Sequence, residues 1–317
     1  MHWPATILLI LLAGSAAYTQ VTERQAESAN PPIGRFAEVE GLRIHYTDQG
    51  QGRPLILVHG ASTSLLDFHA SIAGPLAARY RVIALDRPGH GYSERPVDAW
   101  PTPSVQARIV HGLAEGLGLE RPILVGHSWA GSLVLAYLLA YPDDAAGAVL
   151  LAGGTHPWEG GVAWYNDLAG VPVLGSLFAY TLGGALGPLA IDSGIAEVLA
   201  PDPVPEGYRF RTGVDLSLRP RTFLANAEDV RRLSPFLAEQ RAGYSRIQVP
   251  LLLITGDGDD LVPAWNHADR LILEAPRARQ VVIPGAGHGL HHSRTDLVVG
   301  LIDGFVAETA EARLAGH

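Results

Sequence analysis

The chain has 317 residues, of which 47% are hydrophobic and 17% are charged. This composition excludes intrinsic disorder and is typical of a globular protein with a large core. The formal charge of −9 argues against a nucleic-acid partner, because nucleic-acid-binding proteins normally present a basic surface. The absence of cysteine excludes disulfides, cysteine-based zinc sites and a cysteine nucleophile. Catalytic chemistry must therefore come from Ser, Thr, His or carboxylates.

The N-terminus forms a segment of its own. Trp3–Tyr18 carries no charge, and its most apolar part, Ile7–Leu12, resembles the central region of a signal peptide. A full membrane span needs about 20 apolar residues. Two alternatives stay open: an exported protein cleaved near Ala13–Ala17, or a protein held at the membrane by an uncleaved anchor. The polar residues Thr19–Asn30 are expected to form a linker that ends at Pro31–Pro32.

Short runs of β-forming residues recur along the rest of the chain. Phe36–Glu40 and Leu42–Thr47 predict an antiparallel hairpin. Six apolar runs predict strands that are buried on both faces. These runs are Pro54–Val58, Arg81–Leu85, Pro122–Val125, Ala148–Leu151, Pro250–Thr255 and Gln280–Ile283. Helix-length segments between them, such as Ser104–Leu117 and Ser132–Tyr141, predict a mostly parallel sheet with helices on both faces.

A long segment between the strands at Ala148–Leu151 and Pro250–Thr255 breaks this alternation. Its first part, Leu168–Ile191, is uncharged, and its second part, Val214–Arg241, is charged and helix-like. We expect an inserted helical cap over the carboxyl edge of the sheet. A membrane span at Leu168–Ile191 is the less favoured alternative, because five glycines and two prolines interrupt it.

The run Gly126–Gly131 reads Gly-His-Ser-Trp-Ala-Gly and lies between a predicted strand and a predicted helix. This is the context of a nucleophile elbow, in which a serine occupies a strained turn. Small residues must flank it on both sides, as Gly126 and Ala130 do for Ser128, although Ala130 departs from the strict Gly-x-Ser-x-Gly pattern. The following helix N-terminus favours an oxyanion. A chance Gly-x-Ser-x-Ala turn is the alternative at this point.

Further motifs, in the same chain order, make Gly34–Val306 similar to the α/β-hydrolase fold family. His59–Gly60 follows a predicted strand and resembles the His-Gly turn of that family. Asp86–Ser93 resembles the next loop of cap-bearing members, and its Pro and Gly residues are expected to shape a turn. The resemblance implies that the backbone N–H groups of Ala61 and Trp129 form an oxyanion hole.

The fold implied is a mostly parallel central sheet with helices on both faces and an inserted helical cap, as in α/β-hydrolases. We expect an N-terminal signal or anchor segment and linker over residues 1–32. The core is expected over residues 33–157 plus 248–317, and the cap over residues 158–247.

The family order of catalytic groups is serine, then acid, then histidine. Three candidates for the acid follow the penultimate predicted strand: Asp257, Asp259 and Asp260. The family pattern places the acid three residues after Gly256, which selects Asp259 and leaves the other two as turn residues. The glycine-rich loop after the last strand carries His288, which takes the role of the base.

Other histidines are expected to be structural. His291 and His292 follow the proposed base closely, but a metal site would need more ligands and groups that orient them. A polar start to a helix over Thr295–Ala307 is therefore favoured. His59 and His127 are interpreted as turn and packing residues. No metal and no organic cofactor is expected.

The resemblance implies the triad mechanism, in which His288 takes the Ser128 proton and Asp259 orients the imidazole. Haloalkane dehalogenases and epoxide hydrolases of this fold carry Asp at the nucleophile position, so Ser128 disfavours both activities. The first choice is hydrolysis of a carboxylic ester with a hydrophobic portion, because the cap is apolar.

Several alternatives use the same fold. C–C bond, lactone and amide hydrolases and perhydrolases share the triad, and a ligand-binding member without catalysis also stays open. The expected partner is a small hydrophobic ester-like substrate, with membrane association through the N-terminal segment and a location in the cell envelope. The sequence does not predict an oligomeric state.

Overall fold

The computed structural model describes residues 3–315, which contain one eight-stranded sheet. The strands are β1 (Arg35–Val39), β2 (Leu42–Gln49), β3 (Pro54–Val58), β4 (Arg81–Leu85), β5 (Ile123–His127), β6 (Gly147–Leu151), β7 (Leu251–Gly256) and β8 (Ala278–Ile283). They lie in the order β1-β2-β4-β3-β5-β6-β7-β8. β2 pairs antiparallel with β1 and β4, and every other pair is parallel. The predicted hairpin and the six predicted strands are confirmed, with ends that differ by at most two residues. The expected burial on both faces is wrong for β8, which lies at the edge of the sheet and is partly exposed.

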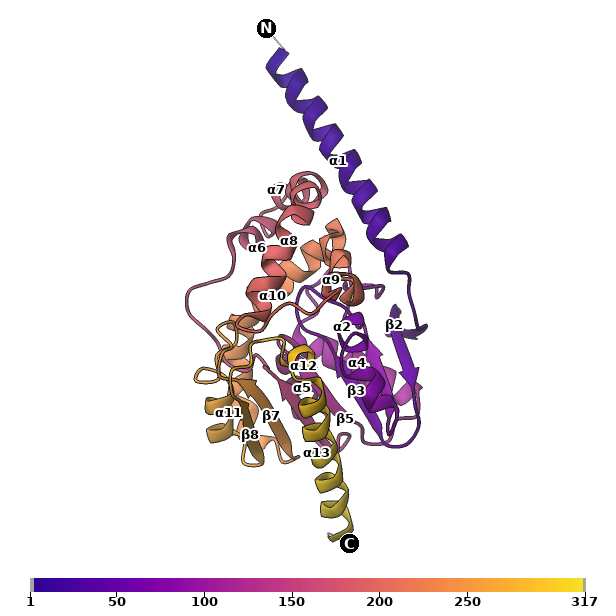
Figure 1. Cartoon of the computed structure of the whole chain (residues 1–317), viewed down its shortest axis with the longest axis vertical. Coiled ribbons are helices and arrows are strands. Elements are labelled where there is room, and N and C mark those ends of the chain that lie inside the picture. The colour runs from indigo at the N-terminus through magenta and orange to yellow at the C-terminus, as the bar shows by residue number, and fades with distance from the viewer. Residues whose placement is uncertain (1–2, 316–317) are drawn as a thin grey trace.

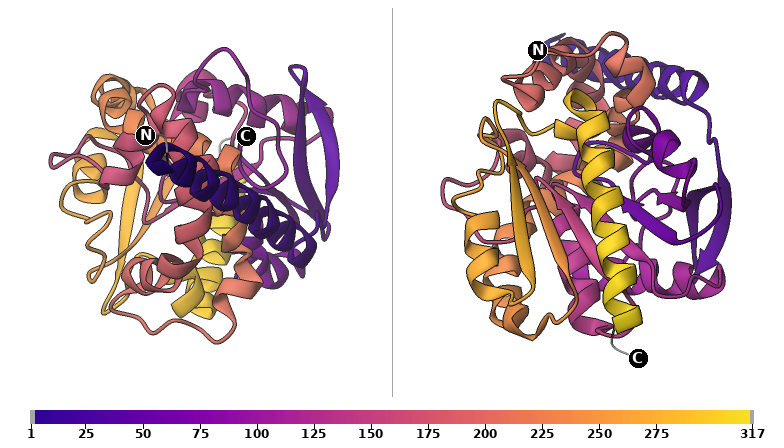
Figure 2. Two further views of the ribbon diagram at one scale, coloured as in Figure 1. Left: turned by 90° about the horizontal axis from the view of Figure 1, so that it is seen from above. Right: turned by 60° about the horizontal axis from the view of Figure 1, so that its bottom comes forward.

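Helices cover both faces of this sheet. The core of one face includes residues of α4 (Pro103–Gly116), α5 (Ala130–Ala140) and α11 (Ala268–Glu274). The core of the other includes residues of α2 (Leu66–His69), α3 (Ala73–Ala77), α12 (Leu290–Ser293) and α13 (Thr295–Ala315), which runs along the sheet in Figure 2. Ile56 packs on the first face and its neighbour Leu57 on the second. Successive strand side chains point to opposite faces, so a sheet covered on both sides requires the continuous apolar runs of the sequence.

The segment between β6 and β7 is helical and gathers at one end of the molecule (Figure 1). Its elements are α6 (Trp164–Ala169), α7 (Leu174–Phe178), the π-helical turn η1 (Ala179–Gly183), α8 (Gly184–Leu199), α9 (Tyr208–Thr212), the 3-10 helix η2 (Val214–Leu218), α10 (Pro220–Gln240) and the 3-10 helix η3 (Arg241–Arg246). We call these elements the cap helices. Leu174–Leu199 is long and apolar enough to cross a membrane, yet 28% of its most apolar window is buried in the protein.

The N-terminal helix α1 (Trp3–Ala29) corrects one expectation from the sequence. The predicted linker over Thr19–Asn30 is instead helical almost to its end, because its Gln, Glu, Arg and Ala residues favour a helix and no Pro or Gly interrupts them. This half of α1 packs on the cap helices, as Figure 2 shows. The Thr19 hydroxyl donates to the Thr181 carbonyl at 2.9 Å, and Glu27 pairs with Arg219 at 3.0 Å. Thr6–Ala29 is also long and apolar enough to span a membrane, and only 6% of its most apolar window is buried.

Candidate active site

Ser128 lies in a tight turn between β5 and α5 with a backbone φ of 54°. Such a positive φ is strained for a residue other than glycine and persists only where the surroundings fix it. Here the Ser128 N–H donates to the Leu151 carbonyl at 2.9 Å. The Ser128 carbonyl accepts from the N–H groups of Gly131 and Gly154, each at 2.9 Å. The turn is therefore held by its neighbours, and the side chain is half-buried at its tip.

The residues around this turn are small because strand and helix approach closely. A Cβ on Gly126 would lie 2.7 Å from a Val134 methyl, and one on Gly131 would lie 2.9 Å from the Gly153 Cα. Ala130 is fully buried in the same place. The departure from the strict Gly-x-Ser-x-Gly pattern is thus accommodated, since a methyl group fits at this position.

The structure brings the three predicted catalytic side chains together. His288 Nε2 lies 2.8 Å from Ser128 Oγ, and His288 Nδ1 lies 2.8 Å from Asp259 Oδ2. Ser128 follows β5, Asp259 follows β7 and His288 follows β8. All three are therefore at the carboxyl edge of the sheet, beneath the cap helices. His288 and Asp259 are buried.

Asp259 is held as an ionised acceptor. Burial raises its pKa, but the hydrogen bond and charge of His288, together with the N–H groups of Val262 and Leu261, lower the pKa below its ordinary value overall. Both N–H groups donate to Oδ1 at 2.9 Å. A carboxylate at Nδ1 favours the tautomer that leaves Nε2 free to accept the serine proton.

The competing aspartates of the same loop are placed differently. Asp257 is exposed and accepts from the Gly285 N–H at 2.5 Å, and Asp260 is exposed. Among residues 3–315, neither forms a hydrogen bond or ion pair with His288, so the geometry favours Asp259 as the acid.

Two backbone amides near the elbow, those of Ala61 and Trp129, were expected to form the oxyanion hole. Within residues 3–315, the N–H groups of Ala61 and Trp129 take part in no hydrogen bond of the turns and loops. The loop that carries Ala61 also approaches the elbow closely, because a Cβ on Gly60 would lie 2.9 Å from the Ser128 Cβ. Both amides are therefore available to an oxyanion beside Ser128 Oγ.

His59 and His127 form hydrogen bonds to backbone groups around the site. His59 Nε2 accepts from the Arg87 N–H at 2.9 Å, and Nδ1 donates to the Gly60 carbonyl at 2.8 Å. Burial, with the nearby Arg87 charge, lowers the pKa of His59 to about 3, so the ring is neutral at pH 7. His127 contacts the His288 carbonyl through Nε2 at 3.2 Å. These contacts match the structural roles expected of the two histidines.

A second group of polar side chains lies behind the loop of His288. Asp67 bonds His291 Nε2 at 2.9 Å and His292 Nε2 at 2.7 Å. The three residues bring potential ligand atoms within 4.8 Å of one another, which is a spacing that could hold a metal ion. Asp67 was not predicted as part of this group, because it lies 224 positions before His291 in the chain. Both imidazoles already use Nε2 toward the carboxylate, so hydrogen bonding accounts for the cluster, and the expectation of no metal remains a prediction.

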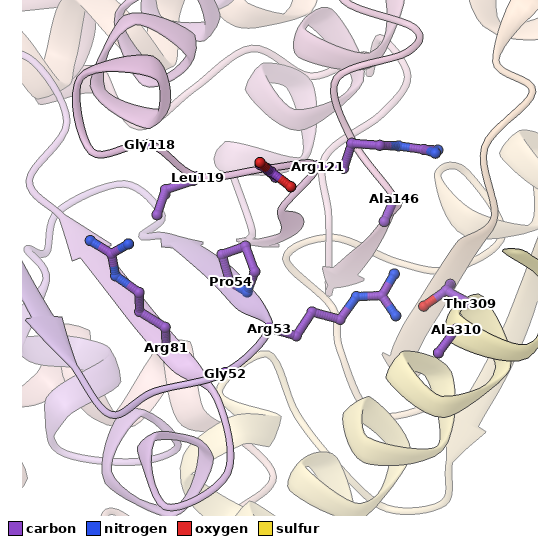
Figure 3. Close-up of a pocket in the computed structure, with 11 residues that line it drawn as sticks. Gly52, Arg53, Pro54, Arg81, Gly118, Leu119, Arg121, Ala146, Thr309 and Ala310 are labelled. Carbon is purple, nitrogen blue, oxygen red and sulfur yellow. The ribbon is translucent and has the colours of Figure 1, made fainter.

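Two sizeable cavities of the described structure lie away from Ser128. The first, about 760 Å³, opens at the amino ends of β3 and β4, opposite the triad. Figure 3 shows that the guanidinium groups of Arg53, Arg81 and Arg121 do not converge on one point there, and Arg81 is paired with Asp48 at 2.8 Å. The second, about 510 Å³, lies between α1 and the cap helices. We assign no catalytic role to either.

Comparison with known proteins agrees with this fold. A family model described as alpha/beta hydrolase fold matches residues 53–295. The chain therefore belongs to the α/β-hydrolase fold family. A 2-hydroxy-6-oxononadienedioate/2-hydroxy-6-oxononatrienedioate hydrolase of Burkholderia vietnamiensis is 30% identical over 262 residues, covering 78% of this chain and 85% of the relative.

Solved structures share the fold. An esterase from Thermogutta terrifontis superposes with a TM-score of 0.70 at 23% identity, over 87% of this chain and 99% of the esterase. A membrane phospholipase A superposes with a TM-score of 0.72 at 21% identity, over 97% of this chain and 98% of that protein. The relatives are hydrolases, and the chain is assigned to the hydrolases of this fold.

Proposed function

We propose that the chain is a serine hydrolase that cleaves carboxylic esters with a hydrophobic portion. The observation that carries the proposal is the continuous hydrogen-bonded path from Ser128 Oγ through His288 to Asp259, with 2.8 Å at each step. A serine hydroxyl is a weak nucleophile until a neighbouring base takes its proton. This path supplies both the base and the group that orients it.

In the first half of the proposed reaction, Ser128 Oγ attacks the ester carbonyl carbon while its proton passes to His288 Nε2. The carbonyl oxygen becomes an oxyanion that accepts from the N–H groups of Ala61 and Trp129. One such donor contributes about 2.7–4 kcal/mol in comparable sites. The C–O bond then breaks, and the alcohol leaves with the proton from His288.

In the second half, a water molecule replaces the alcohol. His288 takes a proton from this water as its oxygen attacks the acyl-enzyme, and the resulting tetrahedral oxyanion uses the same two donors. Collapse releases the acid, and His288 returns the proton to Ser128.

A hydrophobic substrate is supported by the surface of the cap helices. Large apolar side chains face outward on α6 to α8, among them Trp164, Leu174, Leu186 and Leu189. α1 packs against the same helices and continues the apolar surface through Ile7–Leu11. Contiguous exposed apolar surface of this kind marks a membrane or ligand contact in soluble proteins. We therefore place the protein at a membrane of the cell envelope, with α1 as its anchor and the cap facing lipid.

Hydrolysis of a C–C bond is the second candidate. The Burkholderia vietnamiensis relative, at 30% identity, carries such a substrate in its name, 2-hydroxy-6-oxononadienedioate. That substrate is a small dicarboxylic acid, whereas the apolar cap surface of this chain favours an uncharged, hydrophobic one. A non-catalytic binding protein is a third candidate and needs no reactive Ser128.

One set of assays separates the three candidates. Purified protein is tested on p-nitrophenyl esters of increasing chain length, on a 2-hydroxy-6-oxodienoate, and with a fluorophosphonate probe. We expect ester turnover and labelling by the probe, and the loss of both in Ser128→Ala and in heat-denatured protein. Faster cleavage of the dienoate than of any ester would assign the C–C hydrolase. Neither turnover nor labelling would leave only the binding protein.

A further inference from the structure

One face of helix α10 contacts the loop between β3 and α2, which carries Ala61. Asn226 contacts Ser62 of this loop directly, and Asp229 reaches the loop through Arg87. The two residues are three positions apart and therefore lie on one side of the helix. Both side chains are buried. The two residues are far from this loop in the chain, and Asn226 is 164 positions from its partner there. The cap thus covers the loop and also contacts it through specific polar side chains.

Asn226 contacts the residue that follows Ala61. Its Oδ1 accepts from the Ser62 N–H at 2.7 Å, and its Nδ2 donates to Ser62 Oγ at 3.0 Å. Ser62 has a φ of 56°, an uncommon backbone conformation for a residue other than glycine. The Ser62 N–H and the Ala61 carbonyl belong to one planar peptide unit. The first hydrogen bond therefore orients the peptide that follows Ala61, and the second holds the Ser62 side chain against α10.

Arg87 contacts the peptide that precedes Ala61. Its guanidinium donates to the His59 and Gly60 carbonyls, each at 3.1 Å. The Gly60 carbonyl and the Ala61 N–H are the two ends of the same trans peptide and point in opposite directions. Fixing the carbonyl therefore aims the Ala61 N–H.

Asp229 fixes Arg87 in turn. Its Oδ2 accepts from Arg87 Nη1 at 2.8 Å, and both side chains are completely buried. Burial lowers the pKa of Arg87 to about 10 against the opposing effect of Asp229, so the guanidinium remains charged at pH 7. A buried ion pair that loses one partner leaves an uncompensated charge, so the pair holds its geometry strictly.

The second proposed donor is tied to the same helix. The Arg87 guanidinium lies 4.0 Å from the ring centroid of Trp129, and Trp129 Nε1 donates to the Asp229 carbonyl at 3.0 Å. The side chain of Trp129 is therefore clamped between Arg87 and α10, directly after Ser128.

We propose that helix α10 of the cap sets the orientation of the oxyanion-hole donors, with Asn226 as its principal positioning residue and the Arg87–Asp229 pair as its second support. This inference rests on the proposed function, since it concerns the donors of the same site. Its consequence is that cap position and transition-state stabilisation are linked: a displacement of α10 misaims the Ala61 N–H while Ser128, His288 and Asp259 stay in place.

The test replaces Asn226 in the full-length protein. Asn226→Ala should lower kcat about ten- to a hundredfold on a short p-nitrophenyl ester, because a misaimed donor loses part of the stabilisation of an oxyanion-hole contact. KM should change less than about twofold. The affinity for a trifluoromethyl ketone, which forms a tetrahedral oxyanion on Ser128, should fall by the same factor as kcat/KM.

Three further variants make the result specific. Asn226→Asp keeps oxygen acceptors for the Ser62 N–H and O–H groups and should restore most of the activity. Ser62→Ala removes one of the two hydrogen bonds at an exposed residue and should cause a smaller fall in kcat with the same inhibitor pattern. Arg232→Ala, on the part-exposed side of α10, should match the wild type.

Failure of the inference is distinguishable from failure of the proposed function. An active, probe-labelled wild type whose kcat and ketone affinity are unchanged in Asn226→Ala would overturn the inference. So would equal losses of ester turnover and of binding of a ground-state analogue in Asn226→Ala and Ser62→Ala. A wild type that neither turns over esters nor reacts with the probe would overturn the proposed function itself.

Discussion

Apolar side chains are buried at the carboxyl edge of the sheet but exposed on the cap above it. At the edge, the strands leading to Ser128 and Asp259 are fully enclosed, and the loops that follow them are short and heavily hydrogen-bonded. On the cap, leucines face outward, and Leu189 is 81% exposed. The core therefore positions the reacting groups, whereas the exposed apolar side chains of the outer cap favour a particular surrounding medium. The two regions should respond to different substitutions.

The largest effect is expected at the edge. Asp259→Asn keeps the side chain's shape but leaves His288 in the wrong tautomer, so kcat on a soluble ester should fall about 10⁴-fold. Steady-state kinetics on a p-nitrophenyl ester measure this fall. Asp257→Asn and Asp260→Asn in the same loop are the matched controls and should retain activity within about twofold. Equal losses in all three variants would contradict the assignment of the acid.

A smaller, medium-dependent effect is expected on the cap. Replacing both Leu186 and Leu189 by Asp removes side chains whose burial in lipid would contribute about 1.5–3 kcal/mol each. The rate on a long-chain ester presented in phospholipid vesicles should fall at least about tenfold, and the rate on a soluble ester should not change. Leu273→Asp is the control, because Leu273 is 86% exposed but lies on α11 of the core and not on α8. A vesicle rate as fast as that of the wild type would refute the lipid-facing cap.

Acid should act on the core rather than on the cap. Residues 158–247 contain no histidine. In the core, burial lowers the pKa of His59 to about 3, and burial with the neighbouring His156 lowers that of His267 to about 4. Below about pH 6.5, these histidines bind protons in the unfolded state more readily than in the folded state. Their contribution to the free energy of unfolding is therefore fully present above that pH and is lost as the pH falls toward 4.

The free energy of unfolding should therefore be lower at pH 5 than at pH 7.5, as measured by denaturant titration of core fluorescence in detergent. The slope should be the same in His111→Gln, since His111 lies at the surface between Glu115 and Asp144. Equal stability at the two pH values would show that the buried histidines do not control unfolding.

No effect is expected from metal removal. Asp67 is hydrogen-bonded to Nε2 of both His291 and His292, so prolonged treatment with EDTA should leave ester hydrolysis within about twofold of its initial rate. A loss of activity that Zn²⁺ restores would instead make this cluster a metal site.

The sequence predicted what local pattern and chain order encode. Strands covered on both faces must be apolar along their length, so all of them were found, and the elbow around Ser128 is defined by its immediate neighbours. The choice of Asp259 over Asp257 and Asp260 relied on family spacing, and the geometry now favours it independently.

Contacts between distant polar residues were not predicted. Asn226 meets Ser62, and Asp67 meets His291, across more than 160 residues, and no periodicity relates such pairs. Arg87 was visible in the motif Asp86–Ser93 but was interpreted only as part of a turn. The helical state of Thr19–Asn30 was missed because its polarity suggested a linker, whereas its residues favour a helix and its inner face meets the cap.

Because α1 packs on the cap helices, only its first half extends beyond the cap. At about 1.5 Å per residue, the largely exposed part, Trp3–Tyr18, reaches about 24 Å, and the hydrocarbon interior of a bilayer is about 30 Å thick. From Thr19 onward the helix is fastened to the cap. In the membrane-bound arrangement that we propose, no flexible linker would separate the bilayer from the cap, and the cap would lie against the lipid head groups.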